Sequence, residues 1–253
     1  MNALPLAALS PFLLHTLAAQ ATSAPAAIDG DPRIAVHSNA HQPGEAPYGV
    51  WAAGAAYKAR FDGGMTFYPQ LGRDYPRNQP LAWRTTSIRI GGAELLADRP
   101  TPSLAHRDYR VEYSLGRVVE AYDVRSEGLE QTFVFAQRPT GEGDLRITGE
   151  VTTALRAGPV TEHHGDLVFH DDDGTPLVRY GRALAVDADG DQFAMTTSYC
   201  DGTITLRLPA AALAAADFPL VVDPVLAPVL AASMPNAVAI GEVDGAVENL
   251  NTA

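Results

Sequence analysis

The chain is poor in two residue types that support common chemistries. Among its 253 residues it has one cysteine, Cys200, and one lysine, Lys58. A single cysteine has no intrachain disulfide partner and cannot build a cysteine-based zinc site. No basic residue neighbours Cys200 in the sequence. We therefore expect Cys200 to be an ordinary small apolar residue beside the Asp201-Gly202 turn, and not a redox sensor with a lowered thiol pKa.

Positive charge is scarce, and the formal net charge is −12. Nucleic acid requires a basic footprint, so the composition argues against a nucleic-acid partner. It also argues against electrostatic docking on an anionic membrane. Long apolar runs are missing too, and the longest, from Leu4 to Leu17, is too short for a comfortable transmembrane helix.

Familiar catalytic motifs are absent from the sequence. It contains no G-x-S-x-G elbow, no P-loop, no H-E-x-x-H and no strand-linked G-x-G-x-x-G. These absences exclude the enzyme classes that such motifs identify. A Ser-His-Asp triad is a separate matter, because its members meet only in space.

The two ends of the chain differ from its middle. Residues 1–27 contain no charged side chain and combine an apolar run with small residues, as in a secretory signal peptide, although no basic residue precedes the run. Residues 28–47 show no apolar period and are interpreted as a linker, and residues 229–253 as a tail or linker. The segment 48–228 is expected to form one all-β domain, with two sub-sheets as an option, split near 155–165.

Alternating apolar residues predict strands over 110–115, 145–153 and 203–208. Alternation with a period of two is typical of strands that have one buried and one wet face, hence of antiparallel sheets. Asp-Gly pairs at 173–174, 189–190 and 201–202 supply the positive φ of tight turns and predict a β-meander over 165–208. Only 209–216 is expected to be helical. The fold class is therefore an antiparallel β-sandwich or two packed antiparallel sheets.

Several segments resemble one known family. They are Gly-Leu-Glu-Gln-Thr-Phe at 128–133, Gly-Asp-Leu-Val-Phe-His-Asp-Asp-Asp-Gly at 165–174, Val-Arg-Tyr-Gly at 178–181 and the closing Phe-Pro-Leu-Val-Val-Asp-Pro-Val at 218–225. Together they resemble the uncharacterised N-terminal β domain of large secreted bacterial proteins, which often precedes β-propeller or other extracellular repeats. The resemblance spans roughly residues 48–228. It implies a secreted or cell-envelope location, and it implies no catalytic residues.

An aromatic and proline-rich segment over 66–84 is the first candidate for a binding site. Its residues Tyr68, Tyr75, Arg77 and Trp83 offer aromatic faces and planar hydrogen-bonding groups that suit a sugar or peptide. Prolines stiffen the segment and lower the entropy lost on binding. The alternative is an inter-strand loop whose aromatic residues fill the core.

Carboxylates form the second candidate. Glu120, Asp123 and Glu130 flank a turn near residues 126–128, and a pair of carboxylates with one raised pKa can hydrolyse a glycoside. The alternative is solvated surface charge.

Metal binding is the third possibility. Asp187, Asp189 and Asp191 resemble the start of a calcium loop, but Gln192 replaces the sixth-position glycine and Ser198 the twelfth-position glutamate. His163, His164 and His170 lie among aspartates, although the first two are adjacent and would point to opposite faces of a strand. Plain Asp-Gly turns explain the same residues, so we expect no cofactor beyond a weak calcium contact.

These observations favour a non-catalytic structural or binding module, outside the cell or on its surface, with a glycan or an envelope protein as partner. A carbohydrate-active enzyme that uses the paired carboxylates is one alternative, and a spacer or cap of a larger repeat protein is another. The oligomeric state and the ligand are not encoded in any pattern that we can interpret.

Overall fold

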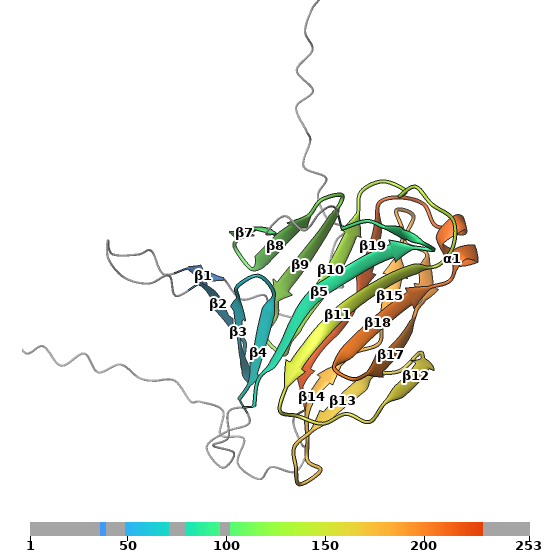
Figure 1. The fold of residues 1–253 in the computed structure, drawn as a ribbon. Coiled ribbons are helices and arrows are strands. Elements are labelled where there is room, and N and C mark those ends of the chain that lie inside the picture. The colour runs from blue at the N-terminus through green and yellow to red at the C-terminus, as the bar shows by residue number, and fades with distance from the viewer. Residues whose placement is uncertain (1–35, 39–48, 71–78, 97–101, 230–253) are drawn as a thin grey trace, which may run out of the picture.

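The computed structural model describes residues 36–38, 49–70, 79–96 and 102–229. Most of these residues lie in antiparallel strands that form two packed sheets, with one short helix, α1 (Ala210–Ala215) (Figure 1). The all-β class and the two packed antiparallel sheets are thereby confirmed, and so is the helix predicted over 209–216.

We name the first layer the β5 sheet; it has ten strands. In spatial order they are β1 (His37–Ser38), β2 (Val50–Ala53), β3 (Tyr57–Phe61), β4 (Met65–Pro69), β5 (Leu81–Ile90), β11 (Leu145–Thr153), β18 (Thr203–Leu208), β17 (Thr196–Cys200) and β12 (Val160–His163), with β6 (Ala93–Glu94) paired to β5.

We name the second layer the β10 sheet; it also has ten strands. Its main path is β13 (Leu167–His170), β14 (Pro176–Tyr180), β20 (Val225–Pro228), β10 (Leu129–Phe135), β19 (Leu220–Asp223), β15 (Leu184–Val186) and β16 (Gln192–Ala194). The remaining strands, β9 (Val118–Val124), β8 (Arg110–Leu115) and β7 (Ser103–Arg107), follow in that order from the other side of β10. Figure 1 shows β5, β11 and β18 in front of β10, β19 and β15.

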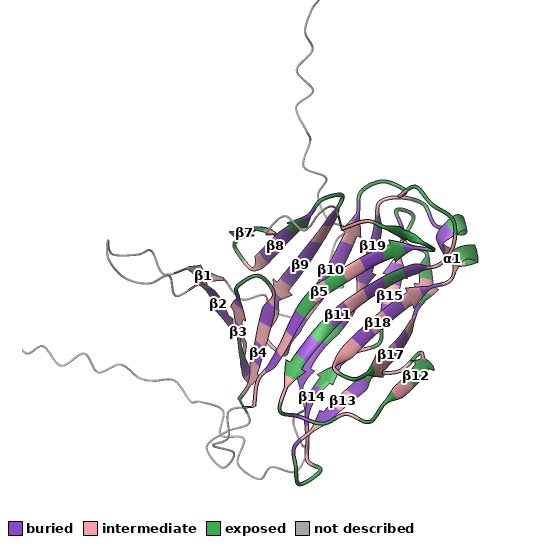
Figure 2. Ribbon diagram, in the orientation of Figure 1, coloured by how far each residue is buried: buried purple, intermediate pink, exposed green. Residues whose placement is uncertain are grey.

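The predicted strands begin and end where the alternation does. β8, β11 and β18 cover 110–115, 145–153 and 203–208, and their buried residues alternate with half-buried or exposed ones (Figure 2). The apolar residues of each strand face the other sheet. The sandwich interior is one continuous cluster of buried side chains drawn from both sheets.

The Asp-Gly turns have the expected backbone conformation. Gly174 and Gly190 adopt φ values of 81° and 87°, and Asp201 and Gly202 adopt 47° and 74°. Two successive positive φ values are those of the tight turn that matches the twist of a hairpin. The turn at 201–202 therefore closes the β17–β18 hairpin in register.

The predicted meander over 165–208 is wrong in its pairing. The segment forms three separate hairpins, β13–β14, β15–β16 and β17–β18, of which the first two lie in the β10 sheet and the third in the β5 sheet. Strands from outside the segment pair with each hairpin instead, because β14 and β15 bind β20 and β19. Both sheets draw strands from either side of residues 155–165, so the sheets do not divide the chain there.

An irregularity in β5 sets which of its side chains face inward. The register with β11 shifts between Thr148 and Gly149, and one extra residue of β5, Thr86, lies at the shift. A bulge of this kind moves the phase of a strand by one residue. As a result both halves of β5 direct side chains into the core, Trp83 from the first half and Ile88 from the second.

The last described strands occupy the middle of the β10 sheet. β10 pairs on one side with β9, and on the other with β19 over Phe133–Phe135 and with β20 over Leu129–Glu130. The segment 218–225 thus joins β10 to both remaining hairpins of that sheet. It is a central element and not an edge.

The predicted end segments fall largely outside the described residues. Residues 1–27 and 230–253, with the signal-peptide and tail predictions, lie beyond them, whereas two residues of the expected linker form β1, which pairs with β2. Within the described ranges, no helix has the length and apolar character needed to cross a membrane.

Candidate functional site

The structure separates the aromatic residues that the sequence grouped together. Trp83 points into the sandwich, whereas Tyr68 stands on the outer face of the β5 sheet and is half-buried. Tyr75 and Arg77 lie outside the described residues. The proposed aromatic site therefore cannot present Trp83 to a ligand, since that side chain is 2% exposed.

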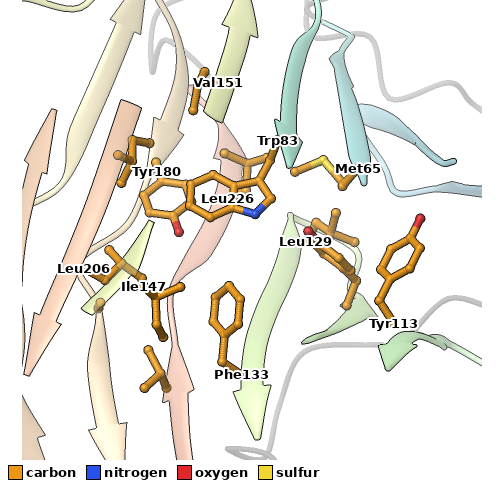
Figure 3. Close-up of a cluster of buried hydrophobic side chains, with 14 of the residues drawn as sticks. Met65, Trp83, Tyr113, Leu129, Phe133, Ile147, Val151, Tyr180, Leu206 and Leu226 are labelled. Atoms are coloured by element: carbon orange, nitrogen blue, oxygen red, sulfur yellow. The ribbon is translucent and has the colours of Figure 1, made fainter. Parts of the chain in front are cut away.

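Trp83 is a central core residue. Its ring stacks on Tyr180 of the other sheet at a centroid distance of 5.6 Å and an interplanar angle of 13°, and Figure 3 shows the pair among apolar side chains from both sheets. Gly149 lies directly beside the indole, where an added Cβ would approach ring atom Cζ2 to 2.1 Å. Any side chain at position 149 would therefore overlap the Trp83 ring, so this packing requires glycine there.

Glu120 is the polar centre of the interior. Its Oε1 accepts hydrogen bonds from Trp83 Nε1 at 3.0 Å, Tyr122 OH at 2.5 Å and Gln131 Nε2 at 2.8 Å, and its Oε2 accepts one from Thr85 Oγ1 at 2.8 Å. Burial raises the pKa of this carboxyl, and the four donors partly oppose the rise. Because Trp83 and Thr85 belong to one sheet and the other residues to its partner, the carboxylate links the two layers.

The three candidate catalytic carboxylates lie on two faces of the β10 sheet. Asp123 and Glu130 are cross-strand partners on the outer face, while Glu120 is on the inner face with 3% exposure. Arg110 Nη1 contacts Asp123 Oδ2 at 2.6 Å, and Arg125 forms an ion pair with Glu130. The structure thus brings two of the three together, each with an arginine.

The sequence reasoning missed a third member of this outer cluster, Asp223. Burial, followed by the nearby negative charge of Glu130, raises the pKa of Asp223 to about 8, although Arg125 acts in the opposite direction. Asp223 therefore holds its proton at neutral pH and can donate it in a hydrogen bond to Glu130. The signal was available, since an aspartate ends the apolar Leu220–Val222 run in a closing strand.

This outer cluster of Asp123, Glu130 and Asp223 can hold a proton, but its ion pairs with two arginines indicate a structural role. Arg110 pairs with Asp123 Oδ2 and Arg125 with Glu130 Oε2, so one oxygen of each carboxylate is already held in an ion pair. The surface hollow lined by Thr66, Arg84 and Glu150 lies on the β5 sheet, away from this cluster.

The calcium-like segment is a turn whose first aspartate is engaged with backbone amides. Asp187 Oδ1 accepts hydrogen bonds from the backbone N–H groups of Asp189 and Asp191 at 3.0 and 2.9 Å, and its Oδ2 accepts one from Asp217 N at 3.0 Å. These amides lower the pKa of the Asp187 carboxyl. One oxygen of Asp187 thus closes the turn, as in an Asx turn, and the other binds the backbone at Asp217, after α1.

The histidine candidates are likewise engaged with backbone. His163 Nδ1 lies 3.0 Å from the Thr197 carbonyl oxygen, and His164 Nδ1 lies 2.9 Å from that of Met195. Across the described parts of the chain, His, Cys, Asp and Glu side chains form no group of three that could hold a metal ion.

Cys200 is exposed at the end of β17. Its Sγ donates to Asp201 Oδ2 at 3.4 Å, and the adjacent carboxylate raises the pKa of the thiol. A raised pKa keeps the sulfur protonated and poorly nucleophilic.

An aromatic pair on the outer face of the β5 sheet was not expected from the sequence. Trp51 of β2 and Tyr68 of β4 lean over β3 and stack at a centroid distance of 5.8 Å and an interplanar angle of 27°. The Arg60 guanidinium lies 5.9 Å from the Trp51 ring centroid and binds Asp62 at 2.7 Å. Both residues are half-buried. We call Trp51 and Tyr68 the aromatic pair.

A hollow of about 220 Å³ lies on the same outer face. A row of Cα partners leads to it from the aromatic pair, because Trp51 pairs with Arg60, Arg60 with Thr66 and Thr66 with Ala82. Its polar lining includes Asp62, Thr66, Arg84, Glu150 and Thr152. The volume is below the roughly 300–1,000 Å³ of typical small-molecule pockets, so the hollow suits one unit of a larger ligand.

Comparison with protein-family models, with curated protein sequences and with solved structures finds no match to this chain.

Proposed function

We propose that the protein is a non-catalytic module, outside the cell or on its surface, that binds a glycan on the outer face of the β5 sheet. The aromatic pair is the observation that supports this proposal most directly. Half-buried tryptophan and tyrosine rings combine a large apolar face with a polar N–H or O–H group, which suits the mixed surface of a sugar. Arg60 and Thr66 beside the pair, and Glu150 at the hollow, supply donors and acceptors for hydroxyl groups.

The shape of the face favours binding over turnover. The hollow is small and adjoins a broad sheet surface, so a polymer chain can lie along it without being enclosed. A hydrolase requires two carboxyl groups at a fixed separation on either side of the substrate. Asp123 and Glu130, the only adjacent pair among the candidates proposed from sequence, lie on the other sheet and are each bound to arginine.

The test measures retention of the protein on immobilised polysaccharides together with release of soluble oligosaccharide. We expect the protein to be retained without product, and Trp51→Ala to weaken retention at least about tenfold, as expected for loss of an aromatic contact at a binding site. Tyr109→Ala, a half-buried tyrosine between β7 and β8 of the other sheet, is the matched control. Thermal melting of each variant shows that the fold is intact.

Two results would contradict the proposal. Retention of Trp51→Ala equal to that of the unchanged protein would remove the aromatic pair from the binding face. Release of oligosaccharides would instead favour the carbohydrate-active alternative and direct attention to Glu130.

A further inference from the structure

Three arginines lie side by side on the outer face of the β5 sheet. Arg89 of β5 pairs with Arg146 of β11, and Arg146 pairs with Arg207 of β18. Like charges directly opposite each other on neighbouring strands are destabilising. This arginine row occurs in a chain with only 18 Lys and Arg residues and a net charge of −12, so abundance of positive charge does not explain it.

Acidic side chains lie at both ends of the arginine row, but only Arg207 forms short ion pairs. Glu94 of β6 is the cross-strand partner of Arg89, and its carboxylate oxygens accept hydrogen bonds from Ser87 Oγ and from the Ile88 and Leu96 amides. Arg207 binds Asp144 and Glu162, each at 2.7 Å. Arg146 has a single long contact, at 3.4 Å to Asp144, and Arg89 donates one hydrogen bond, to the Gly92 carbonyl oxygen at 2.9 Å. Both side chains are exposed. Most of the five N–H donors of each guanidinium therefore face solvent.

A row of hydroxyl side chains runs next to the arginine row. It crosses four neighbouring strands through Ser87, Thr148, Thr205 and Ser198. Along β11 the arginine row, the hydroxyl row and the hollow follow one another at Arg146, Thr148 and Glu150. At the rise of a strand, Arg146 lies about 13 Å from Glu150. One extended ligand can therefore contact all three.

We propose that the ligand of this face is an anionic polysaccharide, whose carboxylate or sulfate groups are bound by Arg89 and Arg146. Planar guanidinium groups bind both kinds of oxyanion in bidentate fashion. The side chains of the hydroxyl row can form hydrogen bonds with the hydroxyl groups of the sugar, as donors or as acceptors. This inference rests on the proposed function, since it assigns the chemical class of the ligand on the same face.

The experiment titrates the full chain with four polymers at two salt concentrations. They are dextran as the neutral polymer, polygalacturonate as the carboxylated one, dextran sulfate as the sulfated one and double-stranded DNA as a polyanion that is not a polysaccharide. Binding is compared for the unchanged protein, for Arg89→Gln/Arg146→Gln, and for the control Arg107→Gln/Arg179→Gln. The control removes the same charge from exposed sites on the β10 sheet.

We expect polygalacturonate or dextran sulfate to bind more tightly than dextran, and more weakly as salt rises. The double variant in the arginine row should weaken acidic-polymer binding by roughly tenfold or more, leave dextran binding unchanged, and melt at the same temperature. The control variant should bind as the unchanged protein does. The acidic polymer that binds more tightly identifies the charged group of the ligand as carboxylate or sulfate.

Other outcomes overturn the inference in distinguishable ways. Equal binding of dextran and the acidic polymers, unaffected by the arginine substitutions but lost in Trp51→Ala, would leave the proposed glycan function and reject the anionic ligand. Equal binding of DNA would show unspecific charge attraction. Binding of none of the polymers would overturn both the inference and the proposed function.

Discussion

At the scale of single residues, Glu120 shows how a carboxyl group can be placed inside a β-sandwich. An isolated carboxylate in such an interior would be very costly. Here four donors converge on the carboxyl group. Without it, the Tyr122 and Thr85 hydroxyls lose this acceptor, and Trp83 Nε1 and Gln131 Nε2 keep only Thr85 Oγ1 and Tyr122 OH. The cluster thus depends on one side chain.

Two substitutions at position 120 separate charge from hydrogen bonding. Glu120→Ala removes the acceptor of the Tyr122 and Thr85 hydroxyls and leaves Trp83 Nε1 and Gln131 Nε2 with one acceptor each, so we expect a loss of at least about 2 kcal/mol in the free energy of unfolding. Glu120→Gln keeps an acceptor oxygen for those donors and offers its amide to the Thr85 hydroxyl, so we expect less than half that loss. Urea unfolding at pH 7 measures both. Equal destabilisation by the two variants would show that the charge itself is required.

The residues around this cluster could in part have been foreseen from the sequence. Trp83 is in phase with Leu81, and Glu120 is in phase with Val118, Tyr122 and Val124, so their burial follows from the period-two pattern. The bridge between Glu120 and Thr85 could not have been foreseen. It depends on the bulge in β5 and on which strands face each other across the sandwich, and neither leaves a local signal.

At the scale of elements, the contact between β5 and β11 depends on the missing side chain of Gly149. The Trp83 indole occupies the space where a Cβ would lie. Close packing leaves the ring no room to withdraw, since it is stacked on Tyr180. The bulge next to Gly149 is therefore coupled to the core.

Gly149→Ala should destabilise the protein by about 2 kcal/mol or more, because it overpacks the centre of the sandwich. Gly158→Ala is the matched control, since nothing lies within 4 Å of an added Cβ there and the residue is exposed. Tryptophan fluorescence during thermal unfolding reports both the loss and the displacement of Trp83. A normal midpoint for Gly149→Ala would show that the ring can move.

Element boundaries were predicted well and element partners were not. β8, β11 and β18 match the alternating segments residue for residue, because alternation and Asp-Gly turns are local properties. The pairing of β14 with β20 and of β15 with β19 is decided by non-local packing. The aromatic pair was missed for the same reason, since Trp51 and Tyr68 meet across an intervening strand.

At the scale of the whole molecule, Asp223 links stability to pH. Its pKa of about 8 lies above the ordinary value of 3.8. Between these values the folded chain keeps a proton that the unfolded chain has released. The free energy of unfolding contributed by this group therefore falls as the pH rises from about 4 to about 8, and is constant above that range.

Asp223→Asn should remove this pH-dependent cost. An asparagine amide can still donate to Glu130 and has no proton to lose, so we expect a stabilisation on the order of 1–3 kcal/mol at pH 8 that disappears near pH 4. Asp189→Asn, an exposed turn residue, controls for the change in net charge. Denaturant unfolding across this pH range measures the difference. A constant difference at all pH values would mean that Asp223 does not titrate in this window.

The central position of β19 and β20 has a consequence for the order of assembly. β9 and β10 can pair as soon as they exist, but the hairpins β13–β14 and β15–β16 have no place in the β10 sheet until residues 220–228 lie between them and β10. The β10 sheet therefore cannot be completed before residues 220–228 have been synthesised. Once β19 and β20 are present, they pair with β10 on one side and with the two preformed hairpins on the other, and this step completes the sheet.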